Sequence, residues 1–189
     1  MGIRWLGEFE MKVFLTSVGE RTTDLCRWQL ERLGFEVVLL ADKEPWIVKY
    51  AKFLELARKT KENCLRIDAD IICNKYIKIF QDIDAFIAKA HVYDLYRNEV
   101  WPLSPVYYSK EALQEIHNTS WAVDINRPET GVWRLFQKRT IVLPEVVGLH
   151  GFFQDKETIK RAKQNKIDRN QIQDYDFELV ERIYAEDFH

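Results

Sequence analysis

Hydrophobic residues in the first part of the chain form short runs separated by a helical pattern. Met11–Ser17 and Phe35–Ala41 are mostly apolar without alternation, which predicts strands buried on both faces. Between them, apolar residues recur at helical spacing over Leu25–Leu33, and Gly34 is suited to end that helix. A strand, a helix and a second strand in this order predict a parallel sheet covered by helices.

The pattern continues through the middle of the chain. Trp46–Lys59 carries the clearest apolar stripe and is predicted to be an amphipathic helix, and Cys64–Ile67 reads as a short buried strand. Helical spacing over Tyr76–Ala90 predicts a helix, which is followed by a strand at His91–Tyr96. Asn98–Pro105 contains two prolines and is expected to be a loop.

Shorter elements are expected in the second half. They are a brief strand Val106–Tyr108, a helix Lys110–His117 capped by Ser109, a helix from Pro128 to about Lys138, and strands Thr140–Leu143 and Val146–Leu149 separated by Pro144. The whole pattern predicts an α/β protein with one mostly parallel central sheet flanked by helices over residues 11–155. Residues 1–10 are interpreted as an N-terminal extension, with Met11 a candidate start of the natural protein. Residues 156–189 are interpreted as a short helical C-terminal segment packed on or beside the domain.

Composition limits the classes of function. A chain of 189 residues is sufficient for one domain, and its net charge of −2 provides no basic field for nucleic acid. The three cysteines lie in or beside predicted buried elements, which favours reduced thiols and a cytoplasmic setting. No apolar run approaches the roughly 18 residues of a membrane span, so a soluble protein is expected. The basic stretch 156–169 is interpreted as a solvated helix face, with peripheral contact to an anionic membrane as the alternative.

The sequence Asp68-Ala69-Asp70 carries the strongest chemical signal. It follows a predicted buried strand, where residues two apart share a face, so both carboxylates are expected to point together from the strand end. Paired carboxylates suit a hard divalent cation. The alternative is a polar turn that ends a buried strand.

Two further segments resemble those of a known enzyme family. Ala51-Lys52 with Leu56-Ala57-Arg58 forms a basic helix pattern, and Lys52 lies sixteen residues before Asp68. The run Pro128–Phe136, then Leu143-Pro144 and His150-Gly151, forms a closing segment. With the Asp-x-Asp sequence, these features resemble the nucleotide-sugar-dependent glycosyltransferases of the GT-A fold, and residues 68–80 resemble its glycogenin-type branch.

The resemblance covers roughly residues 11–155 and implies a GT-A-like, Rossmann-like sheet. It implies a metal-dependent glycosyltransferase of hexosyltransferase type, which moves a sugar from a nucleotide-diphosphate-sugar donor, with a UDP-sugar favoured, to a hydroxyl of a sugar, glycan or protein acceptor. One departure concerns the sugar site, because Ser104-Pro105-Val106 stands where an Asn-x-Gly-Val often occurs. The retaining or inverting outcome is left open.

The resemblance assigns the metal ligands. Asp70 is expected to bind Mn²⁺ or Mg²⁺ directly, and Asp68 to share the metal or bind the donor ribose. His150 is expected to add a nitrogen ligand, which favours Mn²⁺ because imidazole is softer than oxygen. The metal would stabilise the departing diphosphate. The alternative for His150 is a strand-end histidine without a ligand role.

Donor contacts are expected beyond the ends of the first strands, where ligands bind in open parallel sheets. The base and ribose are assigned to the first two strand ends, with a solvated loop as the alternative. Lys52, with Lys49, is expected to bind the donor phosphates. The alternative for Lys52 is that its aliphatic stem covers core residues while its ammonium stays in solvent. The donor set is Thr16, Ser17, Arg21, Asp42, Lys49, Lys52, Asp68 and Ala69.

Glu129 is the acid expected on the acceptor side, with Asp124 as the second candidate. In inverting relatives an acid near this position deprotonates the acceptor hydroxyl, and in retaining relatives it positions the acceptor or the sugar. The alternative is an acidic residue placed favourably at a helix N-terminus.

Other functions remain open. The principal alternative is a degenerate member of the fold that binds a nucleotide or a partner without transferring sugar. A sugar-phosphate nucleotidyltransferase is less favoured because the loop after the first strand has one glycine, Gly19. A haloacid-type phosphatase places its Asp-x-Asp after the first strand, whereas here the pair follows the third.

Overall fold

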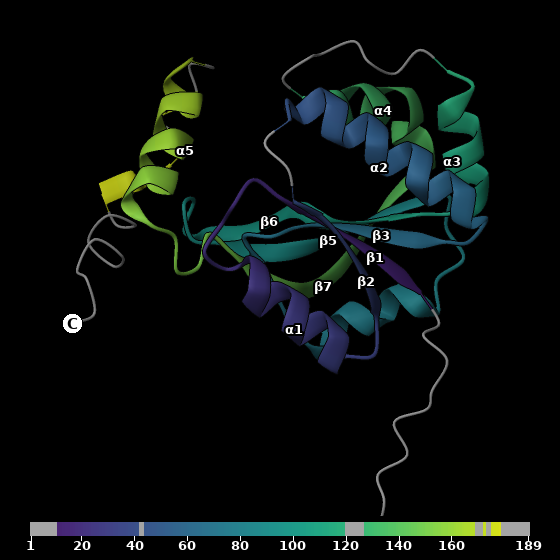
Figure 1. Cartoon of the computed structure of the whole chain (residues 1–189), viewed down its shortest axis with the longest axis horizontal. Helices are drawn as coiled ribbons and strands as arrows, with labels where there is room; N and C mark the ends of the chain where they lie inside the picture. Colours follow the sequence, from purple (N-terminus) through teal and green to yellow (C-terminus); the bar gives the residue numbers. More distant parts are fainter. Residues whose placement is uncertain (1–10, 42–43, 120–126, 169–171, 173–174, 179–189) are drawn as a thin grey trace, which may run out of the picture.

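A seven-stranded sheet forms the centre of the protein, with strand order β2-β1-β3-β6-β5-β7-β4 (Figure 1). The computed structural model describes residues 11–41, 44–119, 127–168, 172 and 175–178, and Asp42 and Asp124 lie outside them. The strands are β1 Lys12–Ser17, β2 Glu36–Ala41, β3 Cys64–Asp68, β4 Ile71–Cys73, β5 Ile87–Asp94, β6 Glu99–Tyr108 and β7 Thr140–His150.

The strand directions bring the chemically interesting residues to one edge. β1 pairs in parallel with β2 and β3, and β6 is antiparallel to both β3 and β5, so β5 runs in the direction of β3. β7 is parallel to β5, whereas β4 is antiparallel to β7. Five of the seven strands therefore share a direction, and they end at Ala41, Ser17, Asp68, Asp94 and His150.

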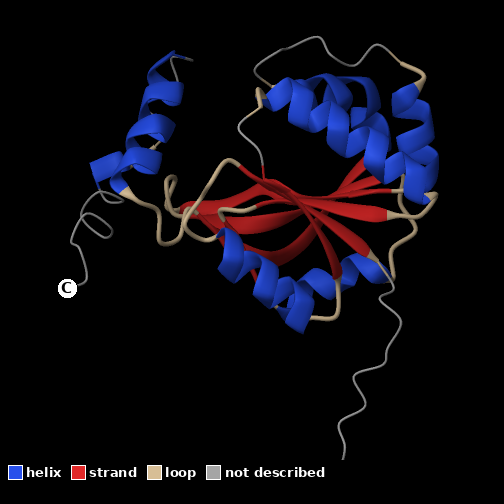
Figure 2. Ribbon diagram, viewed as in Figure 1, coloured by secondary structure: helices blue, strands red, loops and turns tan. Residues whose placement is uncertain are grey.

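Helices cover both faces of the sheet (Figure 2). Alternation along the strands separates two cores: Val13 and Leu15 pack into one, and Phe14 between them packs into the other. One face is covered by α1 Thr23–Arg32 and the 3₁₀-helix η1 Lys75–Gln81. The other face is covered by α2 Trp46–Thr60, α3 Lys110–His117 and α4 Pro128–Phe136. The short 3₁₀-helix η2 Gln137–Arg139 follows α4.

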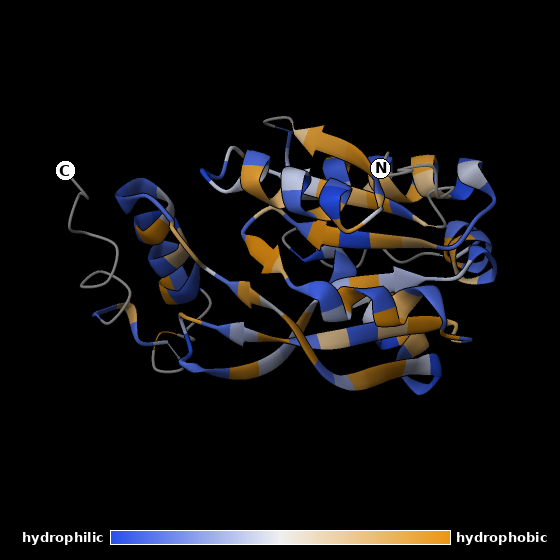
Figure 3. Cartoon of the chain, turned by 90° about the horizontal axis from the view of Figure 1, so that it is seen from below, coloured by the Kyte–Doolittle hydropathy of each residue, from blue (hydrophilic) through white to orange (hydrophobic). Residues whose placement is uncertain are grey.

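The helix α5 Lys156–Asp168 stands beside the sheet rather than on either face (Figure 1). Ile159 anchors it by packing with Tyr96 and Phe177. Most of its remaining surface is polar, in contrast to the apolar strands (Figure 3). No helix in the described ranges is long and apolar enough to cross a membrane.

The predicted α/β class is confirmed, and most elements of the first half lie within a residue or two of their predicted bounds. The predicted loop Asn98–Pro105 is wrong, because these residues belong to β6. β3 pairs with β6 only over Val106–Tyr108, so the earlier part of β6 has β5 as its paired neighbour. A proline without an N–H is tolerated there because no ladder hydrogen bond is required on its open side.

Two other predictions need correction. The helix predicted over Tyr76–Ala90 is the short η1, and Ile87 already begins β5. The strands expected on either side of Pro144 form one strand, β7, with irregular register against β5. In both places pairing with neighbouring strands outweighs the local pattern.

Candidate active site

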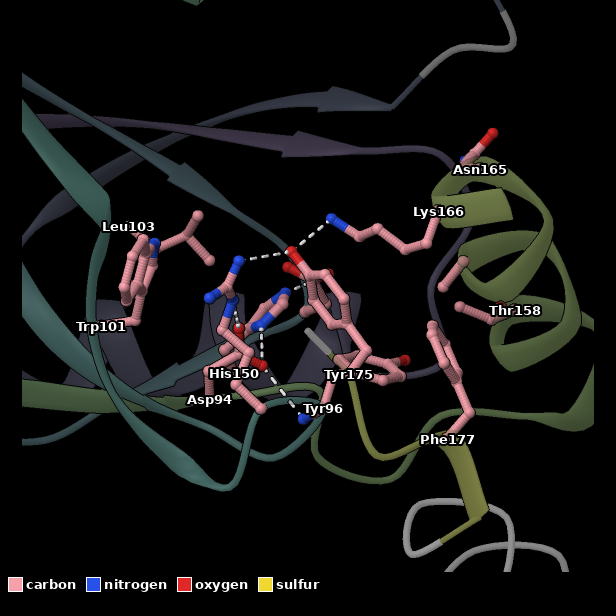
Figure 4. Close-up of a pocket in the computed structure, with 13 residues that line it drawn as sticks. Asp94, Tyr96, Trp101, Leu103, His150, Thr158, Asn165, Lys166, Tyr175 and Phe177 are labelled. Carbon is pink, nitrogen blue, oxygen red and sulfur yellow. Dashed lines mark hydrogen bonds and ion pairs between the residues drawn. The ribbon is translucent and has the colours of Figure 1, made fainter. Parts of the chain in front are cut away.

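Strand register places His150 between two aspartates. Residue 71, at the start of β4, pairs with His150, so Asp70 lies just before that pair, and Asp94 of β5 pairs with His150 directly. The His150 Nε2 atom is 3.1 Å from Asp70 Oδ2, and Nδ1 is 2.9 Å from Asp94 Oδ1. Figure 4 shows the imidazole beside Asp94 at the wall of a cavity. The sheet therefore builds an aspartate–histidine–aspartate arrangement from the ends of β5 and β7 and the turn between β3 and β4.

The charges of this arrangement support one another. Burial opposes a charge on His150, but the carboxylates of Asp70 and Asp94 outweigh it and raise the pKa of the imidazole well above its usual range. Burial would raise the pKa of Asp70, yet the charge and hydrogen bond of His150 lower it overall. Asp70 Oδ1 is buried and has no hydrogen-bond partner among the described residues. One oxygen of this carboxylate is therefore available to a ligand.

Gly151 fixes the backbone next to His150. Its φ of +78° favours glycine, and a Cβ there would lie 2.5 Å from the Tyr96 ring. Its N–H donates to the Asp70 carbonyl at 3.0 Å. A glycine after the histidine thus lets β7 end against the turn that carries Asp70.

Asp68 has different partners. The Arg66 guanidinium donates to both of its oxygens, at 2.6 and 3.3 Å, and the Thr16 hydroxyl donates to Oδ1 at 2.9 Å. The expected common orientation of Asp68 and Asp70 is therefore not found. β3 ends at Asp68, and Asp70 lies in the turn before β4, so strand alternation no longer relates them.

The donor set of Asp70 and His150 fits a divalent cation. A hydrogen bond from Nδ1–H of His150 to Asp94 would leave the Nε2 lone pair for a metal, which is a common orientation of histidine ligands. Asp68 fits less well because Arg66 neutralises its carboxylate. Within the described ranges no three His, Cys, Asp or Glu side chains are arranged to hold a metal, so a cation would need further ligands from substrate or water.

A cavity of about 220 Å³ opens beside Asp70 and His150. Two cations meet in it: Arg97 Nη2 and Lys166 Nζ donate to the Tyr175 hydroxyl at 3.1 and 2.6 Å (Figure 4). The Arg97 guanidinium also lies 4.1 Å from the Trp101 ring centroid and 4.6 Å from that of Tyr175. Burial favours the neutral phenol, but the two cations lower the pKa of Tyr175 overall. The cavity is suited to an anionic ligand.

The residues at the end of the first strand that were predicted to bind the donor contact other side chains of the protein. The Ser17 hydroxyl donates to Glu20 at 2.6 Å and lies 2.7 Å from Thr23 Oγ1. The Arg21 guanidinium stacks 4.4 Å from the Phe153 ring centroid. The Thr16 hydroxyl binds Asp68, and the donor role of these residues stays a prediction.

The two predicted lysines of α2 differ in position. Lys49 is fully buried and donates to the Ser17 carbonyl at the end of β1, whereas Lys52 is exposed. Ala69 is buried, and its N–H donates to the Thr16 carbonyl. Lys49 is thus the lysine nearer to the strand end.

Glu129 begins α4 on the same side of the sheet as Asp68. Its Oε2 accepts the indole N–H of Trp46 at 2.7 Å, and the Trp46 ring lies 5.2 Å from the Arg66 guanidinium. Through Trp46 and Arg66, Glu129 is linked to Asp68 rather than to Asp70. Its predicted role toward an acceptor stays a prediction.

Four residues of the observed site are absent from the predicted set: Arg66, Asp94, Arg97 and Lys166. Asp94 ends the observed β5 but lies inside the predicted strand His91–Tyr96, so its position at a strand end was not visible. Arg66 is a charge two residues before Asp68 on the same strand face, which is a detectable signal. Arg97 and Lys166 had none, because α5 brings Lys166 to the site from a distant part of the chain.

No protein-family model matches the sequence, and no curated protein matches it significantly. Solved structures do resemble the chain. A glycosyltransferase involved in the glycosylation of the major capsid of PBCV-1 is 15% identical with a TM-score of 0.52, covering 78% of this chain and 97% of its own. A197 from STIV is 15% identical with a TM-score of 0.51, covering 71% and 82%. The two likenesses show the fold alone: the chain has a Rossmann-like α/β sheet that matches the sheet of this glycosyltransferase.

Proposed function

We propose that this protein is a metal-dependent glycosyltransferase that moves a sugar from a nucleotide-diphosphate-sugar donor to an acceptor hydroxyl. The observation that carries the proposal is His150 held between Asp70 and Asp94 at the carboxyl edge of the sheet. Its support is an oxygen–nitrogen ligand pair beside a cationic cavity, on a fold shared with a glycosyltransferase.

Asp70 and His150 would hold the cation, with Mn²⁺ favoured over Mg²⁺ because of the imidazole. The bound cation would supply Lewis-acid stabilisation of the diphosphate leaving group. Asp94 would orient the imidazole through Nδ1. Asp68 is then the donor-side carboxylate, because its fixed partner Arg66 holds it away from the ligand pair.

The cations of the cavity beside Asp70 and His150 would bind the donor phosphates. Arg97 and Lys166 both donate to the Tyr175 hydroxyl. A phosphate oxygen that replaced this hydroxyl would receive two charge-assisted hydrogen bonds. Lys49, at the end of β1, is the nearer of the two predicted lysines to this edge. A UDP-sugar is the proposed donor.

The reaction breaks the bond between the anomeric carbon and the diphosphate oxygen and forms one to the acceptor oxygen. The acceptor hydroxyl loses its proton, and Glu129 is the proposed base or positioning acid. The Trp46 hydrogen bond holds one of its oxygens and leaves the other for the acceptor.

A degenerate, non-catalytic nucleotide-binding protein is the second candidate. One observation favours it: Arg66 already satisfies both oxygens of Asp68, so half of the Asp-x-Asp motif has its partners within the chain.

Thermal denaturation with nucleoside diphosphates, each with and without Mn²⁺, tests the proposal. We expect UDP with Mn²⁺ to raise the melting temperature and neither alone to do so fully. A UDP-sugar should then be hydrolysed or transferred in the presence of Mn²⁺. Stabilisation without turnover on any UDP-sugar would select the degenerate candidate, and no metal-dependent stabilisation across the nucleotides would overturn donor binding.

A further inference from the structure

A second, smaller cavity lies on the α4 side of the sheet. It encloses about 40 Å³ and is lined by Arg66, Lys89, Leu103, Glu129 and Trp133 among others. Leu103 also lines the large cavity beside Asp70 and His150. The two cavities therefore lie on either side of one side chain of β6.

Strand register explains why two cations meet in this small cavity. Val106 of β6 pairs with Arg66 of β3 on one side and with Lys89 of β5 on the other. The three residues thus form one row on one face, and the backbones of the two basic residues are two strand spacings, or about 10 Å, apart. Long basic side chains at that separation can approach one anion from opposite sides.

Both cations have unused donors. The Arg66 side chain is only 5% exposed, and its Nη atoms bind Asp68. Its Nε is buried and has no hydrogen-bond partner in the part of the chain that the structure describes. Lys89 makes no hydrogen bond or ion pair with the described residues. Burial and the charge of Arg66 lower the pKa of Lys89, and Glu129 opposes this only in part.

We propose that this cavity binds a carboxylate of the acceptor, so that the acceptor is an acidic sugar of the uronic acid type. The inference rests on the proposed function. Arg66 Nε–H and the Lys89 ammonium would each serve one carboxylate oxygen. A volume of about 40 Å³ accepts a carboxylate but not a sugar ring. The ring would lie at the mouth against Trp133, which is 43% exposed, with a hydroxyl directed to Glu129.

The test measures binding of methyl β-D-glucuronide and methyl β-D-glucoside to the full chain by calorimetry, in EDTA and without donor. The two probes differ in a carboxylate and a hydroxymethyl group. We expect the glucuronide to bind about tenfold more tightly or more, and acetate to compete with it. The preference should disappear in Lys89→Met, return in part in Lys89→Arg, and persist in the control Lys138→Met, which changes an exposed lysine of η2.

Equal binding of the two probes, or a preference that survives in folded Lys89→Met, overturns the inference. Stronger competition by inorganic phosphate than by acetate overturns the choice of a carboxylate. Because donor and metal are absent, these results do not depend on the nucleotide experiment. If the protein preferred the glucuronide but bound no nucleotide, the proposed sugar transfer would be overturned, and the bound sugar could not be its acceptor. The carboxylate site itself would still be supported.

Discussion

Asp68 and Asp70 stand two residues apart in one motif, yet their surroundings differ in kind. Asp68 is bound by a buried, permanently charged arginine and by Thr16. Asp70 faces His150, a group that can lose its proton, and one of its buried oxygens has no partner within the described ranges. A guanidinium cannot give way to a metal by deprotonation, whereas an imidazole can. The comparison indicates that Asp68 is a structural and donor-side carboxylate and that Asp70 is the carboxylate open to a cation.

Replacing each aspartate by asparagine gives the largest expected contrast. Asp70→Asn should lower Mn²⁺ affinity by more than about 100-fold, because changes to outer-shell partners alone lower it by about 10–100-fold. Asp68→Asn should change it by less than about tenfold, but should lower the free energy of unfolding by about 1–3 kcal/mol, because the buried donors of Arg66 lose a charged acceptor. Metal titration and urea denaturation of both variants measure the two effects. Equal loss of metal affinity in both would remove the distinction.

Asp94→Asn tests whether the half of the site around Asp70 depends on an orienting partner. Asp94 touches His150 only through Nδ1, so we expect Mn²⁺ affinity to fall by about 10–100-fold while Asp70 and His150 remain. The matched control is Glu99→Gln, which removes an exposed carboxylate paired with Arg97. Wild-type affinity in Asp94→Asn would show that His150 does not act as a ligand held by Asp94.

The smallest expected effect is the pH dependence of stability in metal-free protein. The pKa of His150 is raised in the folded state, so its charge stabilises the fold fully below the unfolded value of 6.5 and this contribution is lost as pH rises through the folded pKa. In EDTA, the melting temperature of His150→Gln should therefore lie below that of wild type at pH 5.5 and approach it at high pH. A difference independent of pH would mean that the imidazole contributes by packing alone.

Local signals identified much of this protein. The apolar runs and helical stripe up to Ile67 predicted the strands and helices, since each element there follows its own period. The rule that strand ends carry function selected Ser17, Asp68 and His150, and all three lie at the carboxyl edge. The same rule would have selected Asp94 if the end of β5 had been placed correctly.

The errors lie where pairing decided the structure. Ile87 begins a strand inside a helical pattern, and Pro102 lies in a strand because β5 supplies its ladder. Arg66 and Lys89 could not be joined from the sequence, since Lys89 lies within the predicted helix Tyr76–Ala90, whereas in the structure it pairs with Val106 of β6. Lys166 reaches the site only through the packing of Ile159 on Tyr96 and Phe177.

The sequence by itself determined the α/β class, the Asp-x-Asp motif at a strand end and the histidine after the last strand, because these depend on periods of a few residues. The tertiary structure alone decided that Asp68 belongs to Arg66 and Asp70 to His150. That choice depends on which strands are neighbours and in what register, and no local period encodes the distance between residues 70, 94 and 150.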